Sequence, residues 1–122
     1  MAKIGGNITG RFQTCTTEKN KIGEAEQAWK DAVSQIGWLD LQAGDSKRTT
    51  YNAKVEESTH IFLCDFNSAL YALTLLLDED GAVPNVRAIF KGMVYDVLLI
   101  DNPMEMNEQL EIYLRKVGAW SG

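Results

Sequence analysis

Histidine and cysteine, which build many catalytic and zinc sites, are scarce in this chain. Its 122 residues include one histidine, His60, and two cysteines, Cys15 and Cys64. A lone histidine without a nucleophile and an orienting group does not make a catalytic base, so a structural role is expected for it. The cysteines form no Cys-x-x-Cys pair, which argues against a zinc site. We expect both to be reduced thiols on strands, because a disulfide would need an oxidising compartment that nothing in the sequence indicates.

Two further patterns fall short of a ligand site. Residues 78–81 (Asp-Glu-Asp-Gly) begin like a calcium loop, but the twelfth position of that loop would be Ile89, which cannot supply a bidentate carboxylate. Gly5, Gly6 and Gly10 are not followed by the Lys-Ser/Thr pair of a phosphate-binding loop. The sequence therefore predicts no catalytic residue, no metal site and no cofactor, and the chain is not expected to be an enzyme.

Long hydrophobic runs are also missing. The longest, residues 69–77, is far below the roughly 20 apolar residues that a membrane-spanning helix needs. The first residues lack the apolar core of a signal peptide. We therefore expect a soluble chain that is made in the cytoplasm and does not contact a membrane.

Positive charge is in short supply. The chain has 12 basic and 17 acidic residues, a net charge of −5, so it is not expected to bind nucleic acid generally. The densest basic group lies in a long polar stretch at residues 42–57, where Lys47 and Arg48 are followed by Tyr51 and Lys54. These four side chains could contact a nucleic-acid backbone through charge and stacking, or could form ordinary solvated surface.

The chain has the material for one folded domain. Hydrophobic residues make up 45% of the sequence, which is enough for a core without disulfides or metals. We expect a single domain over residues 1–122, with a flexible N-terminal arm at 1–6 and a flexible tail at 118–122. Trp29 and Trp38 are expected in the core. Trp120 is harder to bury so near the end of the chain, and is a candidate interface anchor.

Several runs have the period-two pattern and the turn residues of strands. They are residues 7–17, which are rich in threonine, and residues 58–66, 86–90, 93–100 and 109–117. Lys91-Gly92 predicts a tight hairpin turn. In the strand after it, the pattern predicts Tyr95, Val97 and Leu99 on one face and Val94, Leu98 and Ile100 on the other. The sequence predicts a mainly β fold, a small antiparallel β-barrel or rolled sheet of about five or six strands with one short helix.

Two regions and one connection complete the expected fold. Residues 29–31 and 33–41 favour two strands, with a helix over 24–36 as the alternative. Residues 18–26 are charged and carry a glycine, which predicts a connecting loop. Residues 67–77 favour a short helix capped by Asn67-Ser68, although a strand over 72–77 is the alternative.

The order of these features resembles one viral family. It comprises the Thr-rich strand at 8–17, the Trp-bearing segment at 29–41, the polar stretch, then Glu57-Ser58-Thr59-His60-Ile61-Phe62, Phe90-Lys91-Gly92-Met93-Val94-Tyr95-Asp96-Val97, Asp101-Asn102-Pro103 and Leu110-Glu111-Ile112-Tyr113-Leu114-Arg115. Over residues 7–117 this order is similar to the head-closure, or head–tail adaptor, proteins of tailed bacteriophages and defective prophages, in particular the PBSX-like prophage proteins of bacilli. The segment at 67–82 is longer and more apolar than the family pattern.

The resemblance implies a role in virion assembly. It implies a small β-barrel subunit that is monomeric until a partner provides a template and then forms a homo-oligomeric ring. The implied partners are the portal or its adaptor and a tail-completion protein, with passing contact to DNA in the channel. Residues 42–57 lie where such proteins carry a channel loop. The implied location is the host bacterial cytoplasm during assembly and then the head–tail interface of the virion. The alternatives are a tail-completion or tail-terminator protein and a small β-barrel binding module.

Overall fold

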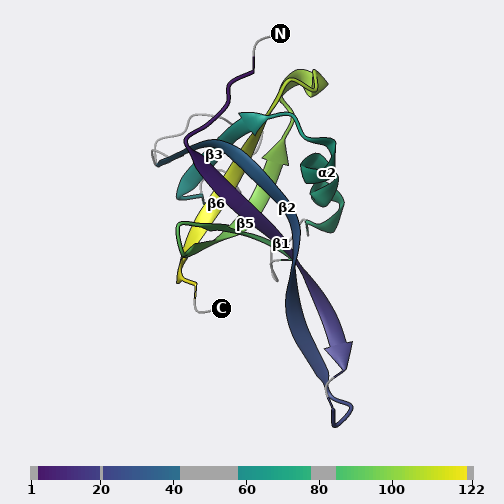
Figure 1. The fold of residues 1–122 in the computed structure, drawn as a ribbon. Helices are drawn as coiled ribbons and strands as arrows, with labels where there is room; N and C mark the ends of the chain where they lie inside the picture. Colours follow the sequence, from purple (N-terminus) through teal and green to yellow (C-terminus); the bar gives the residue numbers. More distant parts are fainter. Residues whose placement is uncertain (1–2, 20, 42–57, 78–84, 121–122) are drawn as a thin grey trace.

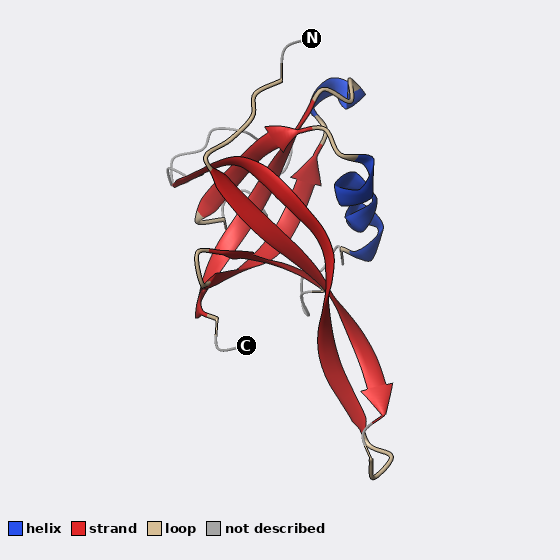
Figure 2. Ribbon diagram, in the orientation of Figure 1, coloured by secondary structure: helices blue, strands red, loops and turns tan. Residues whose placement is uncertain are grey.

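The computed structural model describes residues 3–19, 21–41, 58–77 and 85–120 (Figures 1 and 2). The elements within them are, in chain order, β1 (Ile8–Lys19), β2 (Ala25–Leu41), β3 (His60–Asp65), α2 (Ser68–Tyr71), the 3-10 helix η1 (Ala72–Leu76), β4 (Val86–Phe90), β5 (Met93–Asp101), the 3-10 helix η2 (Pro103–Glu105) and β6 (Gln109–Ala119). The candidate residues of the polar stretch and the acidic turn at 78–81 lie outside the described residues.

The strands of this described part close into one antiparallel barrel in the order β1-β2-β3-β6-β5-β4. Each strand pairs with two neighbours, and the ring is completed by pairing between β1 and β4 over Arg11–Thr14. The predicted mainly β fold of about five or six antiparallel strands with one short helix is confirmed, with six strands in the described residues. Closure hides the strand edges of the barrel, which would otherwise be open to pairing with other chains.

Three phenylalanine rings from three strands form the centre of the core. Phe12, Phe62 and Phe90 are each no more than 1% exposed. Their ring centroids lie 5.9 Å apart for Phe12–Phe62, 6.0 Å for Phe12–Phe90 and 4.8 Å for Phe62–Phe90. Such tilted and edge-on pairs add about 0.5–1.5 kcal/mol each beyond the area they bury. The cluster therefore joins β1, β3 and β4 across the barrel interior.

Two glycines on the barrel wall make room for these rings. A Cβ atom at Gly10 would collide with the ring of Phe90. A Cβ atom at Gly37 would collide with the ring of Phe62 and with the backbone oxygen of Leu63, which cannot rotate away. The absence of a side chain at these two positions is thus what lets the phenylalanines fill the barrel.

One continuous strand replaces the two strands expected at 29–31 and 33–41. β2 runs from residue 25 to 41, so the helical alternative over 24–36 is wrong. The connection expected over 18–26 exists but is shorter, because β1 continues to Lys19 and β2 begins at Ala25. The reason is the long pairing with β1, which extends from Ile8↔Gly37 to Lys19↔Ala25. The far ends of β1 and β2 form a two-stranded ribbon with both faces exposed. Its charged residues therefore show no apolar period in the sequence.

Irregular pairing changes the face pattern expected for β5. The register with β6 shifts between Val97 and Leu99, which leaves Leu98 as an extra residue. A bulge of this kind reverses the alternation that follows it. As a result Tyr95, Val97 and Ile100 belong to the core cluster, whereas the alternation predicted Leu99 in place of Ile100.

The helical segment after β3 begins at a side-chain cap. The Asn67 side chain accepts hydrogen bonds from the backbone N–H groups of Ala69 and Leu70, at 2.9 and 3.3 Å. The predicted short helix is confirmed, and the strand alternative over 72–77 is wrong because η1 occupies Ala72–Leu76. Leu70 and Leu73 face the core.

Both ends of the described chain are attached to the barrel. The carboxylate of Asp65 accepts hydrogen bonds from the backbone N–H groups of Ile4 and Gly5, at 2.8 and 3.0 Å. The indole N–H of Trp38, which is 44% exposed on the barrel surface and not in the core, donates to the carbonyl of Ile4 at 2.9 Å. β6 extends to Ala119. The described residues near both ends thus make contacts with the barrel, whereas the flexible ends expected at residues 1–6 and 118–122 stay a prediction, since residues 1–2 and 121–122 lie outside the described residues.

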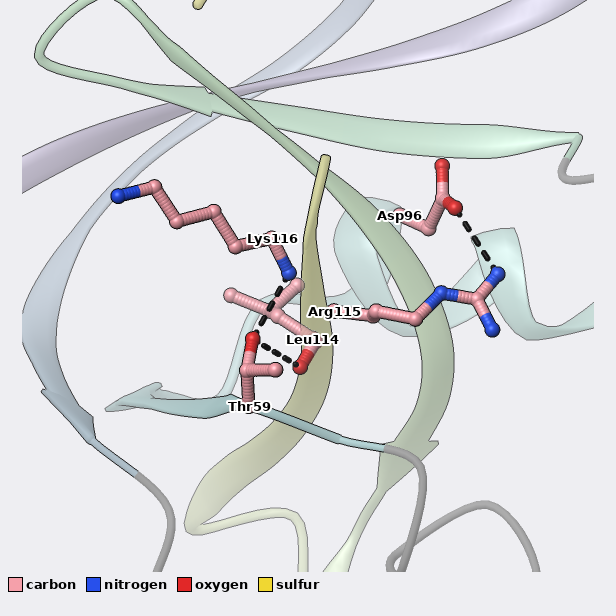
Figure 3. A network of polar contacts seen from close by, with 5 residues as sticks. All are labelled: Thr59, Asp96, Leu114, Arg115 and Lys116. Carbon is pink, nitrogen blue, oxygen red and sulfur yellow. Dashed lines mark hydrogen bonds and ion pairs between the residues drawn. The ribbon is translucent and has the colours of Figure 1, made fainter. Parts of the chain in front are cut away.

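Polar contacts join the residue before β3 to β6, and join β5 to β6 (Figure 3). The Thr59 hydroxyl accepts a hydrogen bond from the backbone N–H of Lys116 at 2.8 Å and lies 3.5 Å from the carbonyl of Leu114. Arg115 donates to Asp96 at 3.0 Å, and these two residues are directly opposite in the β5–β6 register. These contacts hold the register that the core packing requires.

Substitution of Gly37 by alanine tests the packing of the barrel wall. We expect Gly37→Ala to lower the free energy of unfolding by about 1–3 kcal/mol, because the new methyl group overpacks a fixed backbone oxygen and a buried ring. The matched control on the exposed face of the same strand is Ser34→Ala, which should change it by less than about 0.5 kcal/mol. Urea denaturation measures both, and equal effects would contradict the packing described here.

Thiol labelling tests the burial of β3. Burial raises the pKa of the Cys64 thiol to about 12, and the negative charge of Asp65 adds to this effect. Cys15 on β1 is partly exposed, and both thiols are free. Because the thiolate is the reactive form, a maleimide at pH 8 should label Cys15 quickly and Cys64 only after unfolding. Rapid labelling of a folded Cys15→Ser variant would contradict this arrangement.

Candidate docking arm and its base

The ends of β1 and β2 extend beyond the barrel as a two-stranded ribbon (Figure 1). β1 pairs with β4 only over Arg11–Thr14, and β2 pairs with β3 only over Gly37–Leu41, while β1 and β2 remain paired with each other as far as Lys19↔Ala25. We call residues 15–19 and 21–30 the hairpin arm. Since the arm has no sheet or core behind it, its described side chains are mostly exposed, including Ile22 at 77%.

An extra residue marks the place where the hairpin arm leaves the barrel. The β1–β2 register shifts between Phe12, which pairs with Val33, and Gln13, which pairs with Asp31. Ala32 is therefore left without an opposite residue on β1. A bulge bends its strand and increases the local twist, which redirects the ribbon at this point.

A group of polar and aromatic side chains holds this bend from the outside. We call it the base clamp, and its members are Arg11, Gln13, Trp29, Asp31, Arg87 and Trp120. They come from β1, β2, β4 and the residue after β6, four segments that are far apart in the sequence. The clamp therefore ties the start of the hairpin arm, formed by β1 and β2, to two other parts of the barrel, β4 and the end of β6.

The first half of the base clamp is centred on Arg11. Its guanidinium carbon lies 4.5 Å from the centre of the Trp120 ring. Its Nε atom forms an ion pair with the Oδ1 atom of Asp31 at 3.2 Å. The same oxygen accepts a hydrogen bond from the Gln13 side chain at 2.8 Å. A cation stacked on tryptophan contributes about 0.5–1 kcal/mol at an exposed site and more where water is excluded.

The second half is centred on Arg87. Its Nε atom donates to the Gln13 side-chain oxygen at 2.8 Å, and its guanidinium carbon lies 4.3 Å from the centre of the Trp29 ring. Burial lowers the pKa of Arg87, and the positive charge of Arg11 acts in the same direction. An arginine keeps its charge under such a shift, so the stack on Trp29 is a true cation–π contact. Gln13 is 6% exposed and links the two halves.

Trp120 thus has a partner within its own chain. Besides the stack on Arg11, its backbone N–H donates to the carbonyl of Gly92 at 2.8 Å. The sequence predicted a tryptophan on a flexible tail. It could not predict the stacking of this tryptophan on Arg11 of β1, because the two residues are far apart in the chain. The ring is only partly buried, and its role as an interface anchor stays a prediction.

The other candidate residues are not part of this site. Lys47, Arg48, Tyr51 and Lys54 lie outside the residues that the structure describes. His60 lies on β3, half-buried, with Nδ1 2.9 Å from the Thr59 hydroxyl and its ring 5.0 Å from that of Tyr95. Burial lowers the pKa of His60, and the positive charge of Lys116 adds to this effect. The structural role expected for His60 stays a prediction.

An apolar hollow lies beside the helical segment. Its volume is about 340 Å³, and its lining residues are Phe66, Ser68, Tyr71, Ala72, Thr74 and Leu75. The rings of Phe66 and Tyr71 form one wall with their centroids 6.0 Å apart. Leu75 stands at the hollow with 88% of its surface exposed. We call this feature the α2 hollow.

Within the described ranges, no three His, Cys, Asp or Glu side chains gather in a way that could hold a metal ion. No helix in the described part of the chain is long and apolar enough to cross a membrane. The features that the described residues form are a projecting ribbon, a clamp of arginine and tryptophan, and an apolar hollow.

Comparison of the sequence with known protein families and with characterised proteins finds no match. The functional conclusion therefore rests on the sequence pattern and on the geometry above.

Removal of one end of the base clamp should loosen the hairpin arm. Spin labels are attached at Gln27→Cys on the arm and Met104→Cys on η2, in a Cys15→Ser background. We expect Trp120→Ala to broaden the distribution of distances between the two labels. The physical reason is that Arg11 loses the ring on which it stacks, so the bend at the arm's base is held by fewer contacts.

The matched control for this measurement is Arg115→Ala, which breaks an ion pair on the β5–β6 surface that does not touch the hairpin arm. This variant should leave the label distance as narrow as in the parent protein. An equally narrow distribution in the Trp120→Ala variant would mean that the clamp does not orient the arm.

Proposed function

We propose that this chain is a non-enzymatic structural protein of a tailed bacteriophage or prophage that joins the head to the tail as one subunit of a ring. The observation that carries the proposal is the hairpin arm, a ribbon that leaves the barrel and is fixed at its base. A projecting element that is already ordered loses little entropy when it binds another protein. The resemblance of the sequence to head-closure and head–tail adaptor proteins supports the same role.

The exposed apolar residues favour assembly with other proteins. Ile36, Trp38 and Leu41 follow one another along β2 with 48%, 44% and 71% of their surfaces exposed. Because the barrel has closed its own strand edges, contacts between subunits would use such side chains, the hairpin arm and loops. Arginine and tryptophan, the main residues of the base clamp, are also those most enriched at binding hot spots.

The partners follow from the proposed role. They are the portal or its adaptor on the head side, a tail-completion protein on the tail side, and further copies of this chain in the ring. Residues 42–57 would form the channel loop, which would bring Lys47, Arg48, Tyr51 and Lys54 near the DNA. A net charge of −5 would keep the rest of the subunit from gripping DNA as it passes. The protein would be made in the host cytoplasm and end in the virion.

Deletion of the gene from the phage that encodes it tests this role. We expect the lysate to contain tailless heads that have lost their DNA, together with separate tails of normal length. Without this chain the heads would be neither sealed nor joined to tails. Electron microscopy of the particles and the amount of nuclease-resistant DNA measure both effects. Supplying the intact chain in trans should restore infectious particles.

The alternatives give different outcomes in the same experiment. A tail-terminator role would yield filled, intact heads and overlong tails. A host ligand-binding module would leave particle assembly unchanged. Either result would overturn the head–tail joining role.

A further inference from the structure

The outer edge of β2 along the hairpin arm has no neighbouring strand among the described residues. β2 pairs with β3 only over Gly37–Leu41, and the bulge at Ala32 separates that stretch from the arm. Residues 25–31 are therefore paired with β1 on one side and present an open strand edge on the other. In Figure 1 this stretch lies beyond the barrel, where a further strand can approach it.

The backbone groups that point out from this edge follow from the pairing with β1. The carbonyl of Ala28 accepts a hydrogen bond from the Thr16 hydroxyl at 3.3 Å, so this carbonyl faces β1. In an antiparallel ladder, successive residues direct their N–H and C=O groups to opposite sides of the strand. The residues whose backbone groups face outwards are therefore Ala25, Gln27, Trp29 and Asp31. Such a row of groups is a template for pairing with another strand.

The opposite edge of the hairpin arm is shorter. The backbone N–H of Cys15 on β1 donates to the carbonyl of Asn85 at 2.9 Å, so β1 is still bonded there to the residue before β4. Only the last residues of β1 extend past that bond. The edge of β2 thus offers the longer stretch of backbone for a new strand pairing.

The charged side chains on the β2 edge match those of a second copy. Charged residues normally protect an open edge against pairing. When residues 25–31 of two copies pair antiparallel about Ala28, however, Glu26 of each copy lies opposite Lys30 of the other. Both side chains are exposed. Opposite charges in directly opposed positions stabilise a sheet, whereas a centre at Glu26 or at Lys30 would set like charges against each other.

The remaining positions also fit this register. Lys30 interacts within its own chain as well, and an ammonium group has three donors, so it can hold that contact together with a carboxylate of the second copy. At the centre the two Ala28 side chains face each other, and they are small enough for the close approach of a non-hydrogen-bonded pair. The outward-facing backbone groups then meet one another, with Gln27 opposite Trp29 of the second copy.

We propose that two copies of this chain pair through residues 25–31 of β2, in an antiparallel register centred on Ala28. The pairing joins the two hairpin arms into one sheet with the strand order β1-β2-β2-β1. A two-stranded ribbon is marginally stable in water and a sheet of three or more strands is more stable, so each arm stabilises the other. The contact is isologous and closes with two copies. It does not depend on the phage role, and it differs from the monomer that the resemblance implies for the free chain.

Charge reversal tests this register in the purified chain by analytical ultracentrifugation. We expect the parent chain to form a dimer that dissociates on dilution. Glu26→Lys and Lys30→Glu should each raise the dissociation constant of the dimer about tenfold, because each sets like charges opposite each other at both ends of the pairing. An equal mixture of these two variants should recover the dimer, and so should the double variant Glu26→Lys, Lys30→Glu, because both restore pairs of unlike charge.

The matched control for charge is Lys19→Glu, which makes the same change as Lys30→Glu at an exposed position on β1, away from the paired edge. It should leave the dissociation constant within about twofold of the parent value. A parent chain that stays monomeric at every concentration would overturn the proposal, and would leave the edge to a strand of a different protein. Equal weakening by Lys19→Glu, or no recovery in the mixture, would overturn it as well.

A disulfide at the two-fold centre tests the geometry independently of charge. In a Cys15→Ser background, Ala28→Cys places two thiols at a non-hydrogen-bonded pair, where Cα atoms lie about 4.5 Å apart and a disulfide can form. Mild oxidation should therefore give a covalent dimer, while the buried Cys64 thiol stays unreactive. Ala25→Cys on the same edge is the matched control, because its two thiols would be about 20 Å apart. Equal yields from the two variants would contradict the register.

Discussion

The unequal pairing lengths of β1 and β2 are the constraint on which the rest of this structure depends. The two strands pair with each other from Ile8↔Gly37 to Lys19↔Ala25, whereas their other neighbours, β4 and β3, pair with them over much shorter stretches. The excess length has to leave the barrel. A two-stranded ribbon is only marginally stable in water by itself, so its stability here comes from continuity with the barrel and from side chains at its base.

The base clamp shows how a surface can fix the direction of such a ribbon without a hydrophobic core. Arg11 and Arg87 are each paired with an aromatic face on one side and with polar side chains on the other. Because Gln13 contacts both Asp31 and Arg87, the members act as a network, and the loss of one weakens its neighbours. The clamp also couples the C-terminal end of the described chain to the hairpin arm through Trp120.

Much of the barrel was predictable from the sequence, and the hairpin arm was not. Half-buried strands alternate apolar and polar residues, and Lys91-Gly92 and Asn67 mark a turn and a helix cap by their backbone chemistry. The strand patterns at residues 7–17 and 29–31 reach only the base of the ribbon, and the charged residues between them look like a loop, so the sequence did not show that β1 and β2 continue as a paired ribbon. The bulges and the clamp depend on contacts between distant segments, which a local pattern does not contain. The sequence shows that arginine and tryptophan residues lie in or near the expected strands. It does not show which arginine stacks on which tryptophan.

Backbone amide hydrogen exchange of the free chain tests most directly whether the hairpin arm is an ordered docking element. If the ribbon is formed before any partner binds, the amides that pair across residues 15–19 and 25–30 should exchange far more slowly than those of an unstructured peptide. Exchange of these amides at unstructured rates, beside a fully protected barrel, would contradict a preformed arm and with it the basis for assigning this chain to assembly.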